Sequence, residues 1–246
     1  MSIPRFFCDT SLDGVTELAL PAQVAHHIRV RRLKAGQSMT LFDGSGLEFE
    51  ATLTFTPAGQ AIATIHAQQT ISRELGGRIR LLQGLTSQDK MDWIIEKAVE
   101  LGVSHVLPTT ANRSVTKLDQ SRSQKRLEHW KRLIISASEQ CGRNQLMIID
   151  PARPLSDALR HCANSTLLLL DADPSQARLE LQALLPRLRA SADISILVGP
   201  EGGWDKTEAD LATSCGAIRT SLGSRVLRTE TAGLSAVSAI TALLAW

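Results

Sequence analysis

The chain has 246 residues, of which 43% are hydrophobic and only 4% aromatic, and its net charge is +2. This composition argues against intrinsic disorder and leaves room for a small domain joined to a larger one, while a charge this small identifies no partner by itself. Four scattered cysteines without a Cys-x-x-Cys pair, and an N-terminus without an apolar run, argue against a zinc site and export, so we expect a cytoplasmic protein.

The first part of the chain, up to residue 72, consists of short alternating runs separated by turn clusters. Strands are predicted at Ser38–Phe42, Glu48–Phe55 and Ala61–His66, because apolar and polar residues alternate there. We predict a small β-barrel. A basic stretch from His26 to Lys34 interrupts it, and taken alone this stretch could be an ordinary solvated face.

From residue 73 onward the pattern changes to strands that alternate with helix-length segments, which is typical of a parallel sheet with crossover helices. We therefore predict a second, α/β domain at residues 73–246. Its predicted strands are Arg80–Gly84, His105–Pro108, Met147–Asp150, Thr166–Asp171, Ile194–Gly199 and Ala217–Leu222. Its predicted helices are Asp89–Leu101, Gln120–Ser138, Pro154–His161, Gln176–Leu185, Lys206–Ser214 and an apolar segment after Thr229, too short to span a bilayer.

A glycine-rich turn follows the predicted strand that ends near Gly199, in the sequence Leu197-Val198-Gly199-Pro200-Glu201-Gly202-Gly203-Trp204. Glycines let the backbone approach a ligand, and ligands collect at the carboxyl ends of strands in α/β sheets. A purely structural turn is equally compatible. Neither a dinucleotide fingerprint nor a phosphate loop is present.

A second segment, Ser221–Ala232, reads Ser-Leu-Gly-Ser-Arg-Val-Leu-Arg-Thr-Glu-Thr-Ala. Thr229 is a plausible N-cap of the last helix, and Glu230 would then lie in its positive first turn. Simple helix capping is therefore an alternative to a functional role for both residues.

The combination of the two segments resembles the SPOUT class of methyltransferases. Within that class it resembles the family that methylates nitrogen 3 of a uridine in bacterial small-subunit ribosomal RNA. The resemblance extends over nearly the whole chain and includes His26-His27, Phe42-Asp43-Gly44-Ser45-Gly46, Lys90, Glu96–Gly102, Asn112-Arg113-Ser114 and Glu139–Arg143. One departure is Asn144-Gln145-Leu146-Met147, where the family often has a proline.

The resemblance implies an N-terminal PUA-like RNA-binding β-barrel, followed by a SPOUT domain with a C-terminal trefoil knot. It also implies that the knot loops bind S-adenosylmethionine, mainly through main-chain groups. The cofactor-binding residues it assigns are Leu170, Val198, Gly199, Pro200, Gly202, Gly203, Leu222, Gly223, Val226, Leu227 and Arg228.

For catalysis, Arg228 could stabilise an anionic uracil oxygen, and Glu201 or Glu230 could accept the proton of the ring nitrogen. Ion pairs of either glutamate with Arg225 or Arg228 are an equally good interpretation, so the general base stays open. Cys141 has no activating neighbour in sequence, which favours a structural role.

RNA contacts are expected from residues that the resemblance places in the barrel and in two loops of the second domain: His27, Arg29, Arg31, Arg32, Lys34, Arg113 and Arg143. The cations among them would neutralise phosphates without reading sequence. Adjacent histidines diverge and no third ligand is at hand, so we predict no metal.

The resemblance further implies a homodimer that pairs through the last helix, with an apolar surface supplied by Leu234, Val237, Ala239, Ile240 and Leu243. The alternative is that this helix is buried in its own subunit. Two other functions remain open: a methyltransferase of the same class with another RNA target, and a ribosome-assembly factor without activity.

Overall fold

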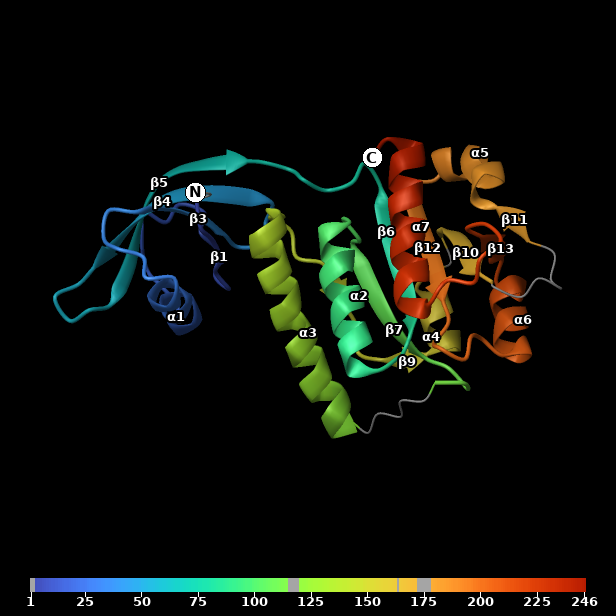
Figure 1. Cartoon of the computed structure of the whole chain (residues 1–246). Coiled ribbons are helices and arrows are strands. Elements are labelled where there is room, and N and C mark those ends of the chain that lie inside the picture. Colours follow the sequence, from blue (N-terminus) through green and yellow to red (C-terminus); the bar gives the residue numbers. More distant parts are fainter. Residues whose placement is uncertain (1–2, 115–119, 163, 172–177) are drawn as a thin grey trace. The chain divides into compact units, whose positions relative to one another are not determined.

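The computed structural model describes residues 3–114, 120–162, 164–171 and 178–246 (Figure 1). The chain divides into two compact units. Unit 1 comprises Met1–Glu74 and Ser138–Leu146, and unit 2 comprises Leu75–Ala137 and Met147–Trp246. The sequence predicted one boundary after residue 72 and gave no sign that Ser138–Leu146 packs with the first unit.

Unit 1 is a five-stranded sheet with one helix. Its elements are β1 (Arg5–Phe7), β2 (Glu17–Ala19), α1 (Ala22–Val30), β3 (Ser38–Phe42), β4 (Leu47–Phe55) and β5 (Ala61–Thr70). The strands pair in the order β1-β3-β4-β5-β2, and only β1 and β3 run parallel. The three strands predicted here are confirmed, and most of the basic stretch forms the end of α1.

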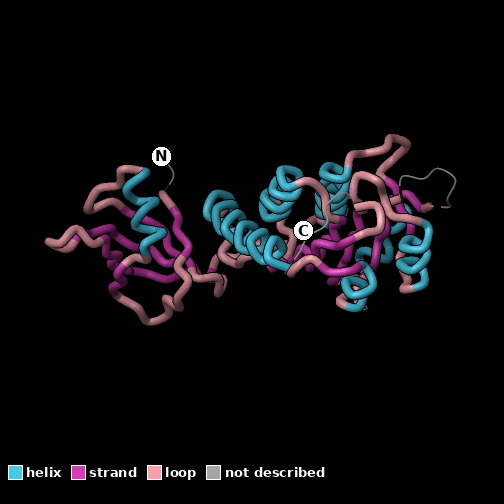
Figure 2. Tube along the Cα trace, turned by 90° about the horizontal axis from the view of Figure 1, so that it is seen from below, coloured by secondary structure: helices cyan, strands magenta, loops and turns pink. Residues whose placement is uncertain are grey.

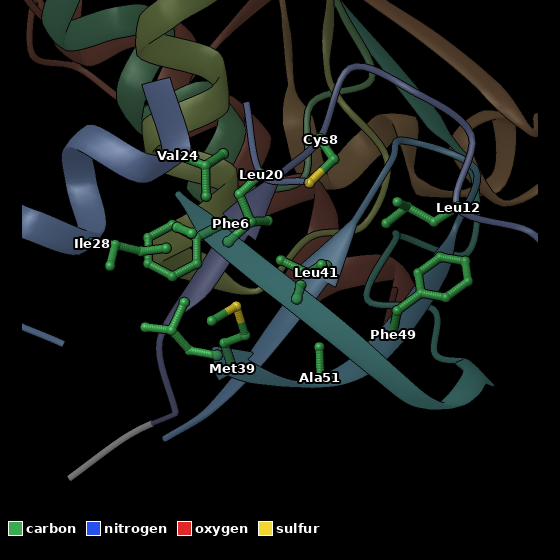
Figure 3. Close-up of a cluster of buried hydrophobic side chains, with 13 residues drawn as sticks. Phe6, Cys8, Leu12, Leu20, Val24, Ile28, Met39, Leu41, Phe49 and Ala51 are labelled. Atoms are coloured by element: carbon green, nitrogen blue, oxygen red, sulfur yellow. The ribbon is translucent and has the colours of Figure 1, made fainter. Parts of the chain in front are cut away.

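One core holds this unit together. Met39 and Leu41 alternate along β3, and both are buried against Phe49 of the neighbouring strand. Val24 and Ile28 lie one turn apart on the buried face of α1 and point into the same cluster (Figure 3). The period of two in the strands and of about four in the helix thus directs one apolar face of each element inward.

Charged side chains fasten Ser138–Leu146 to the rest of unit 1. Arg5 donates hydrogen bonds to the carboxylate of Glu48 and to Oδ1 of Asn144, each over 2.6 Å, and Arg73 pairs with the same carboxylate. Burial opposes ionisation of Glu48, but the two guanidinium groups outweigh it and hold its pKa below the usual value. Asn144 therefore fixes this turn through its side chain, which also donates to the Ile71 carbonyl over 2.8 Å.

Unit 2 is built on an eight-stranded sheet in which all recorded pairs are parallel. Its strands are β6 (Arg78–Gly84), β7 (His105–Thr110), β8 (Ile148–Ile149), β9 (Arg153–Pro154), β10 (Thr166–Leu170), β11 (Leu179–Glu180), β12 (Asp193–Val198) and β13 (Ile218–Ser221). The order is β11-β13-β10-β12-β6-β7-β8, with β9 beside β7. The central strand β12 is buried along almost its whole length, as a strand covered on both faces must be.

Helices cover both faces of this sheet (Figure 2). They are α2 (Gln88–Glu100), α3 (Gln120–Cys141), α4 (Leu155–Arg160), α5 (Leu185–Arg189), α6 (Lys206–Ser214) and α7 (Thr229–Leu244), with a short 3₁₀ helix at Leu181–Leu184. The α/β fold class predicted from the sequence is confirmed. No helix among the described residues is long and apolar enough to cross a membrane.

One predicted helix is wrong. Of the segment Gln176–Leu185, residues 176 and 177 lie outside the described part of the chain, Leu179–Leu184 forms β11 and the 3₁₀ helix, and Leu185 begins α5. Leu181 and Leu184 are buried three residues apart. This spacing suits a 3₁₀ turn as well as an α-helix, and the sequence pattern does not distinguish them.

The last helix is largely buried within its own unit. It packs against β6, β12, α2 and α5, and Val237 and Ile240 are fully buried there. Those two residues are part of the monomer core and supply no surface for a partner. Leu234, Ala239 and Leu243 are half-buried, so only these members of the predicted dimer surface remain accessible.

Candidate functional site

The two sequence segments singled out above leave the sheet at neighbouring points. The strands β13, β10 and β12 are adjacent and parallel, so their carboxyl ends meet at one edge. Leu170 ends β10, the glycine-rich turn follows β12, and the Leu222–Arg228 loop follows β13. This is the edge at which ligands collect in parallel α/β sheets.

A cavity of about 790 Å³ opens at this edge. Its size lies within the range of small-molecule sites. All eleven residues predicted to hold the cofactor line it: Leu170, Val198, Gly199, Pro200, Gly202, Gly203, Leu222, Gly223, Val226, Leu227 and Arg228. The structure thus brings together residues that are up to 58 positions apart in the sequence, from Leu170 to Arg228.

Close backbone packing explains the glycines of the turn. A Cβ atom on Gly199 would lie 3.0 Å from backbone atoms of Gly203 and Trp204, and one on Gly84, at the end of β6, would collide with Pro200. Gly203 has a φ of +69°, which favours glycine. Gly84 was not recognised from the sequence, because a lone glycine at a strand end gives no signal of what it contacts.

A buried hydrogen-bond chain links this turn to the last helix. The amide of Gln83 donates to the Thr229 hydroxyl over 2.9 Å, and that hydroxyl donates to the Gly199 carbonyl over 2.5 Å. The predicted N-cap role of Thr229 is therefore wrong. Arg228 occupies the cap position, and the Thr229 side chain turns away from the helix N-terminus to tie two walls of the cavity together.

The Leu222–Arg228 loop presents exposed side chains around a glycine with positive φ. Gly223 has a φ of +107° with open space around it, so a side chain there would be disfavoured by the backbone conformation alone. Val226 is 75% exposed although it is apolar. The side chain of Arg228 is 83% exposed. This loop leaves apolar and cationic groups available to a bound molecule.

The two candidate glutamates share one lysine. Nζ of Lys90, in the first turn of α2, lies 3.1 Å from Oε1 of Glu201 and 3.6 Å from Oε2 of Glu230. Glu230 is also 4.0 Å from Arg228, the ion pair considered from the sequence, but the lysine is nearer. Lys90 was noted only as part of the family resemblance, since nothing in its spacing connects it to residues more than a hundred positions away.

Hydrogen bonding sets the protonation state of this cluster. Burial disfavours the ionised form of Glu201, but the Thr86 hydroxyl and the Lys90 ammonium outweigh it and hold the pKa of the Glu201 carboxyl below its usual value. The hydrogen bond to Glu201 in turn raises the pKa of Lys90. Both groups are therefore charged at neutral pH.

The residues predicted to bind RNA fall into three groups. Arg29, Arg31, Arg32 and Lys34 are exposed at and after the end of α1, and His27 is half-buried with Nδ1 4.0 Å from Glu139. Arg113 is exposed and lines the cavity in unit 2, where Nη1 donates to the Gly202 carbonyl over 3.2 Å.

Arg143 does not lie on a surface. Its side chain is 4% exposed, and it holds the Glu74 carboxylate through Nε at 3.0 Å and Nη2 at 2.5 Å. A guanidinium enclosed in this way cannot reach a phosphate, so its assignment to RNA binding is not supported. The sequence showed the arginine and not its partner, which is 69 residues away.

Among the described residues, no three His, Cys, Asp or Glu side chains gather closely enough to hold a metal ion. The predicted absence of a metal stays a prediction. Cys141 is a half-buried free thiol.

Comparisons with known proteins agree with this geometry. Residues 73–241 match the model of an RNA methyltransferase domain, and residues 20–65 match an RNA methyltransferase PUA domain. A protein of Bacillus subtilis named ribosomal RNA small subunit methyltransferase E is 28% identical over 96% of this chain and 95% of its own length.

Two solved structures cover 98% of this chain and 98% of their own. One is a ribosomal RNA small subunit methyltransferase E from Neisseria gonorrhoeae bound to S-adenosylmethionine, with 34% identity and a TM-score of 0.89. The other is a putative methyltransferase from Legionella pneumophila in complex with S-adenosylmethionine, with 29% identity and a TM-score of 0.90. The matches confirm the resemblance found in the sequence and the predicted fold class of a PUA-like module followed by a SPOUT domain. The chain therefore belongs to the RNA methyltransferase family that includes ribosomal RNA small subunit methyltransferase E.

Proposed function

We propose that this protein transfers a methyl group from S-adenosylmethionine to nitrogen 3 of a uridine in small-subunit ribosomal RNA. The observation that carries the proposal is the cavity at the carboxyl edge of the sheet, which is lined by every residue expected to hold the cofactor. The relatives from Neisseria and Legionella bind S-adenosylmethionine, and the Bacillus relative is named for small-subunit ribosomal RNA.

The residues present fit S-adenosylmethionine. Main-chain N–H and C=O groups of the Gly199–Gly203 turn can form hydrogen bonds with the polar edge of an adenine ring. Leu222, Val226 and Leu227 supply apolar surface for the same ring. The indole N–H of Trp204, another lining residue, is buried and has no hydrogen-bond partner among the described residues. An acceptor on a ligand would satisfy it. The trefoil knot through these loops stays part of the proposal.

Bound S-adenosylmethionine supplies an electrophilic methyl group, and the protein must make the uracil nitrogen nucleophilic. A protonated ring nitrogen attacks poorly, so one group has to accept its proton and another has to stabilise charge on the uracil oxygens. We assign the second task to Arg228, whose exposed guanidinium lies at the cavity.

Glu230 is the better proton acceptor of the two glutamates. The low pKa of Glu201 makes it a weak base, and its Oε1 already accepts two hydrogen bonds. In contrast, the Glu230 carboxylate has longer contacts, since its Oε2 lies 3.6 Å from Lys90 and its Oε1 lies 4.0 Å from Arg228. Lys90 then acts as a positioning residue that holds both carboxylates in place.

RNA binding is assigned to the exposed cations that follow the buried part of α1, at Arg29, Arg31, Arg32 and Lys34, together with Arg113 at the cavity. In unit 1 these cations are exposed and form no ion pair among the described residues, and the Arg31 guanidinium lies 5.8 Å from the centroid of the Phe6 ring. Exposed cations without a carboxylate partner are suited to neutralising phosphates. The partner proposed for them is small-subunit ribosomal RNA.

We also propose a cytoplasmic homodimer. The half-buried Leu234, Ala239 and Leu243 of α7, and the exposed Trp93 of the adjoining α2, leave apolar surface on unit 2. A symmetric pairing would cover it. Light scattering at micromolar concentration should give twice the chain mass, and an active monomer would refute the dimer.

The test of the activity is the nucleoside composition of small-subunit ribosomal RNA from a strain that lacks the protein. Mass spectrometry of the digested RNA should show loss of N3-methyluridine and of no other nucleoside. Loss of another methylated nucleoside would point to another target. An unchanged composition, together with no heat of S-adenosylmethionine binding in calorimetry, would favour an assembly factor without activity.

A further inference from the structure

The helix α3 carries an excess of positive charge on unit 2, apart from the basic stretch of unit 1. This helix contains five Lys and Arg residues and two Glu residues, a net charge of +3, whereas the whole chain has a net charge of +2. The rest of the chain is therefore slightly acidic. A local charge excess of this kind is more informative about a partner than the small net charge of the protein.

The cations of α3 are arranged by the period of the helix. Leu127, Trp130 and Ile134 are buried and define the inner face of the helix. Lys125 and Arg132 lie seven residues apart, which is two turns, so their side chains share one outer face at a rise of about 10 Å. Both are exposed.

No carboxylate of the described residues neutralises these two cations. Neither Lys125 nor Arg132 takes part in an ion pair within the described residues, and Arg122, also exposed, lies one turn before Lys125. The acidic side chain nearest in sequence, Glu128, is held by Lys131 at 3.0 Å. The carboxylate of Asp92 on α2 faces His129, with 2.8 Å between Oδ2 and Nε2. The remaining carboxylate of the helix, Glu139, lies in the part of α3 that belongs to unit 1.

We infer that this outer face of α3 is a second surface for the phosphate backbone of RNA, located on the catalytic unit itself. The inference rests on the proposed function for the identity of the RNA. A polyanion fits better than a protein, because no exposed large hydrophobic side chain of the described residues lies on α3, and protein interfaces depend on such anchors. The surface would position RNA without reading its sequence.

The experiment compares two double variants that remove the same charge. Lys125→Ala with Arg132→Ala removes two unpaired cations of the outer face, and alanine keeps the helix. The control, Lys131→Ala with Arg160→Ala, removes two cations that are paired with Glu128 and Asp157. Binding to a naked transcript of small-subunit ribosomal RNA is measured from 50 to 200 mM salt, and S-adenosylmethionine affinity is measured in parallel.

The outer-face variant should bind the transcript more weakly, and the slope of log affinity against log salt should flatten by roughly 1.4 to 1.8, because each lost phosphate contact accounts for about 0.7 to 0.9. The control should keep the wild-type slope, and all proteins should keep S-adenosylmethionine affinity. A wild-type slope in the outer-face variant, or equal flattening in the control, would overturn the inference.

A third outcome would show that this face binds ribosomal protein and not RNA. If the outer-face variant loses affinity for intact small subunits but keeps the wild-type slope on the transcript, the face contacts ribosomal protein and the inference is overturned. Failure of the proposed function is a separate result, since it would appear as absence of methyl transfer by the wild-type protein, whatever the salt slopes.

Discussion

The cavity of unit 2 that we propose for the cofactor and the cationic surface of unit 1 are formed by different parts of the chain, backbone turns in one case and side chains in the other. The cavity is made by backbone turns, and its glycines are required by contacts such as that of Gly199 with Gly203 and by the φ of +107° at Gly223. The cationic surface is made by long side chains. The sequence alone does not show whether an arginine or lysine faces solvent or pairs with a buried carboxylate. Glycine-rich turns that line a cavity can therefore be recognised in a sequence, whereas the exposed cations of a surface can be identified only in the tertiary structure.

The largest effect that we expect is at Arg143, which was predicted to lie on the RNA surface and is buried in an ion pair. Replacing it by alanine leaves the Glu74 carboxylate without its partner, and breaking a buried ion pair costs about 3 kcal/mol in the free energy of unfolding. Urea denaturation should show this loss. The slope of RNA affinity against salt should not change, because the side chain does not reach RNA.

Arg160→Ala is the matched control, since it breaks an exposed pair with Asp157 and should cost no more than about 1 kcal/mol. If Arg143→Ala kept wild-type stability and flattened the slope of RNA affinity against salt, Arg143 would be an RNA-binding residue after all.

Gly223→Val tests the backbone site. The positive φ is unfavourable for a β-branched residue by about 1 to 3 kcal/mol, so the loop should shift and S-adenosylmethionine affinity should fall at least tenfold in calorimetry. Gly216 also has a positive φ, of +91°, and a Cβ there meets nothing within 4 Å, but Gly216 does not line the cavity. Gly216→Val should carry similar strain and keep the affinity. Equal losses in both variants would mean that destabilisation alone explains the effect.

Thr229→Val removes the hydroxyl that joins Gln83 to Gly199 and keeps the size of the side chain. It should lower the free energy of unfolding by about 1 to 3 kcal/mol, because the Gly199 carbonyl loses its donor and the buried Gln83 amide keeps only its hydrogen bond to the Gly84 carbonyl. Affinity for S-adenosylmethionine should fall as well, since two walls of the cavity are no longer tied. Thr213→Val, which loses a hydroxyl bonded only within α6, is the control and should leave the affinity unchanged. A Thr229→Val protein with wild-type affinity would restrict Thr229 to a role in folding.

Comparison of prediction and structure follows the same division. Three of the five strands of unit 1, six of the eight strands of unit 2 and most helices of unit 2 could be predicted, because their apolar periodicity is set locally. The strands β1, β2, β9 and β11 have only two or three residues each, which is too short for a periodic pattern, and α1 was interpreted only as a basic stretch. The segment after residue 177 could not be predicted, because spacing of three suits two kinds of helix. Thr229 was assigned to capping because Gly199, the partner of its hydroxyl, is 30 residues away in the sequence.

The cluster of Glu201, Glu230 and Lys90 shows most clearly what cannot be predicted from the sequence. Glu201 and Glu230 could be named from the motifs, but Lys90, which connects them, comes from a helix more than a hundred residues earlier in the chain. Only the parallel sheet, which brings the end of β6 beside the end of β12, places α2 over the cavity. No local sequence pattern predicts that Lys90 contacts Glu201 and Glu230.

The smallest expected effect concerns the pH dependence of this cluster. Lys90→Met removes one of the groups that hold the pKa of Glu201 below its usual value, so that pKa should rise toward normal. A depressed carboxyl pKa gives stability that is present above the unfolded pKa and lost as pH falls through the folded pKa. The variant should therefore lose stability at a higher pH than the wild type during acid titration. Lys97→Met, which removes a lysine paired with Glu96 and Glu100 away from the cavity, should leave the pKa of Glu201 unchanged in an NMR titration. An unchanged pKa of Glu201 in Lys90→Met would mean that Lys90 does not stabilise the Glu201 carboxylate.

The most direct test of the central claim is methyl transfer with purified components. Small ribosomal subunits from a strain lacking the protein are incubated with S-adenosylmethionine that carries a labelled methyl group, and the digested RNA is separated into nucleosides. The wild-type protein should place the label in N3-methyluridine alone, and Gly223→Val should place little or none. Label in a different nucleoside, or no label with a wild-type protein that binds S-adenosylmethionine, would contradict the account.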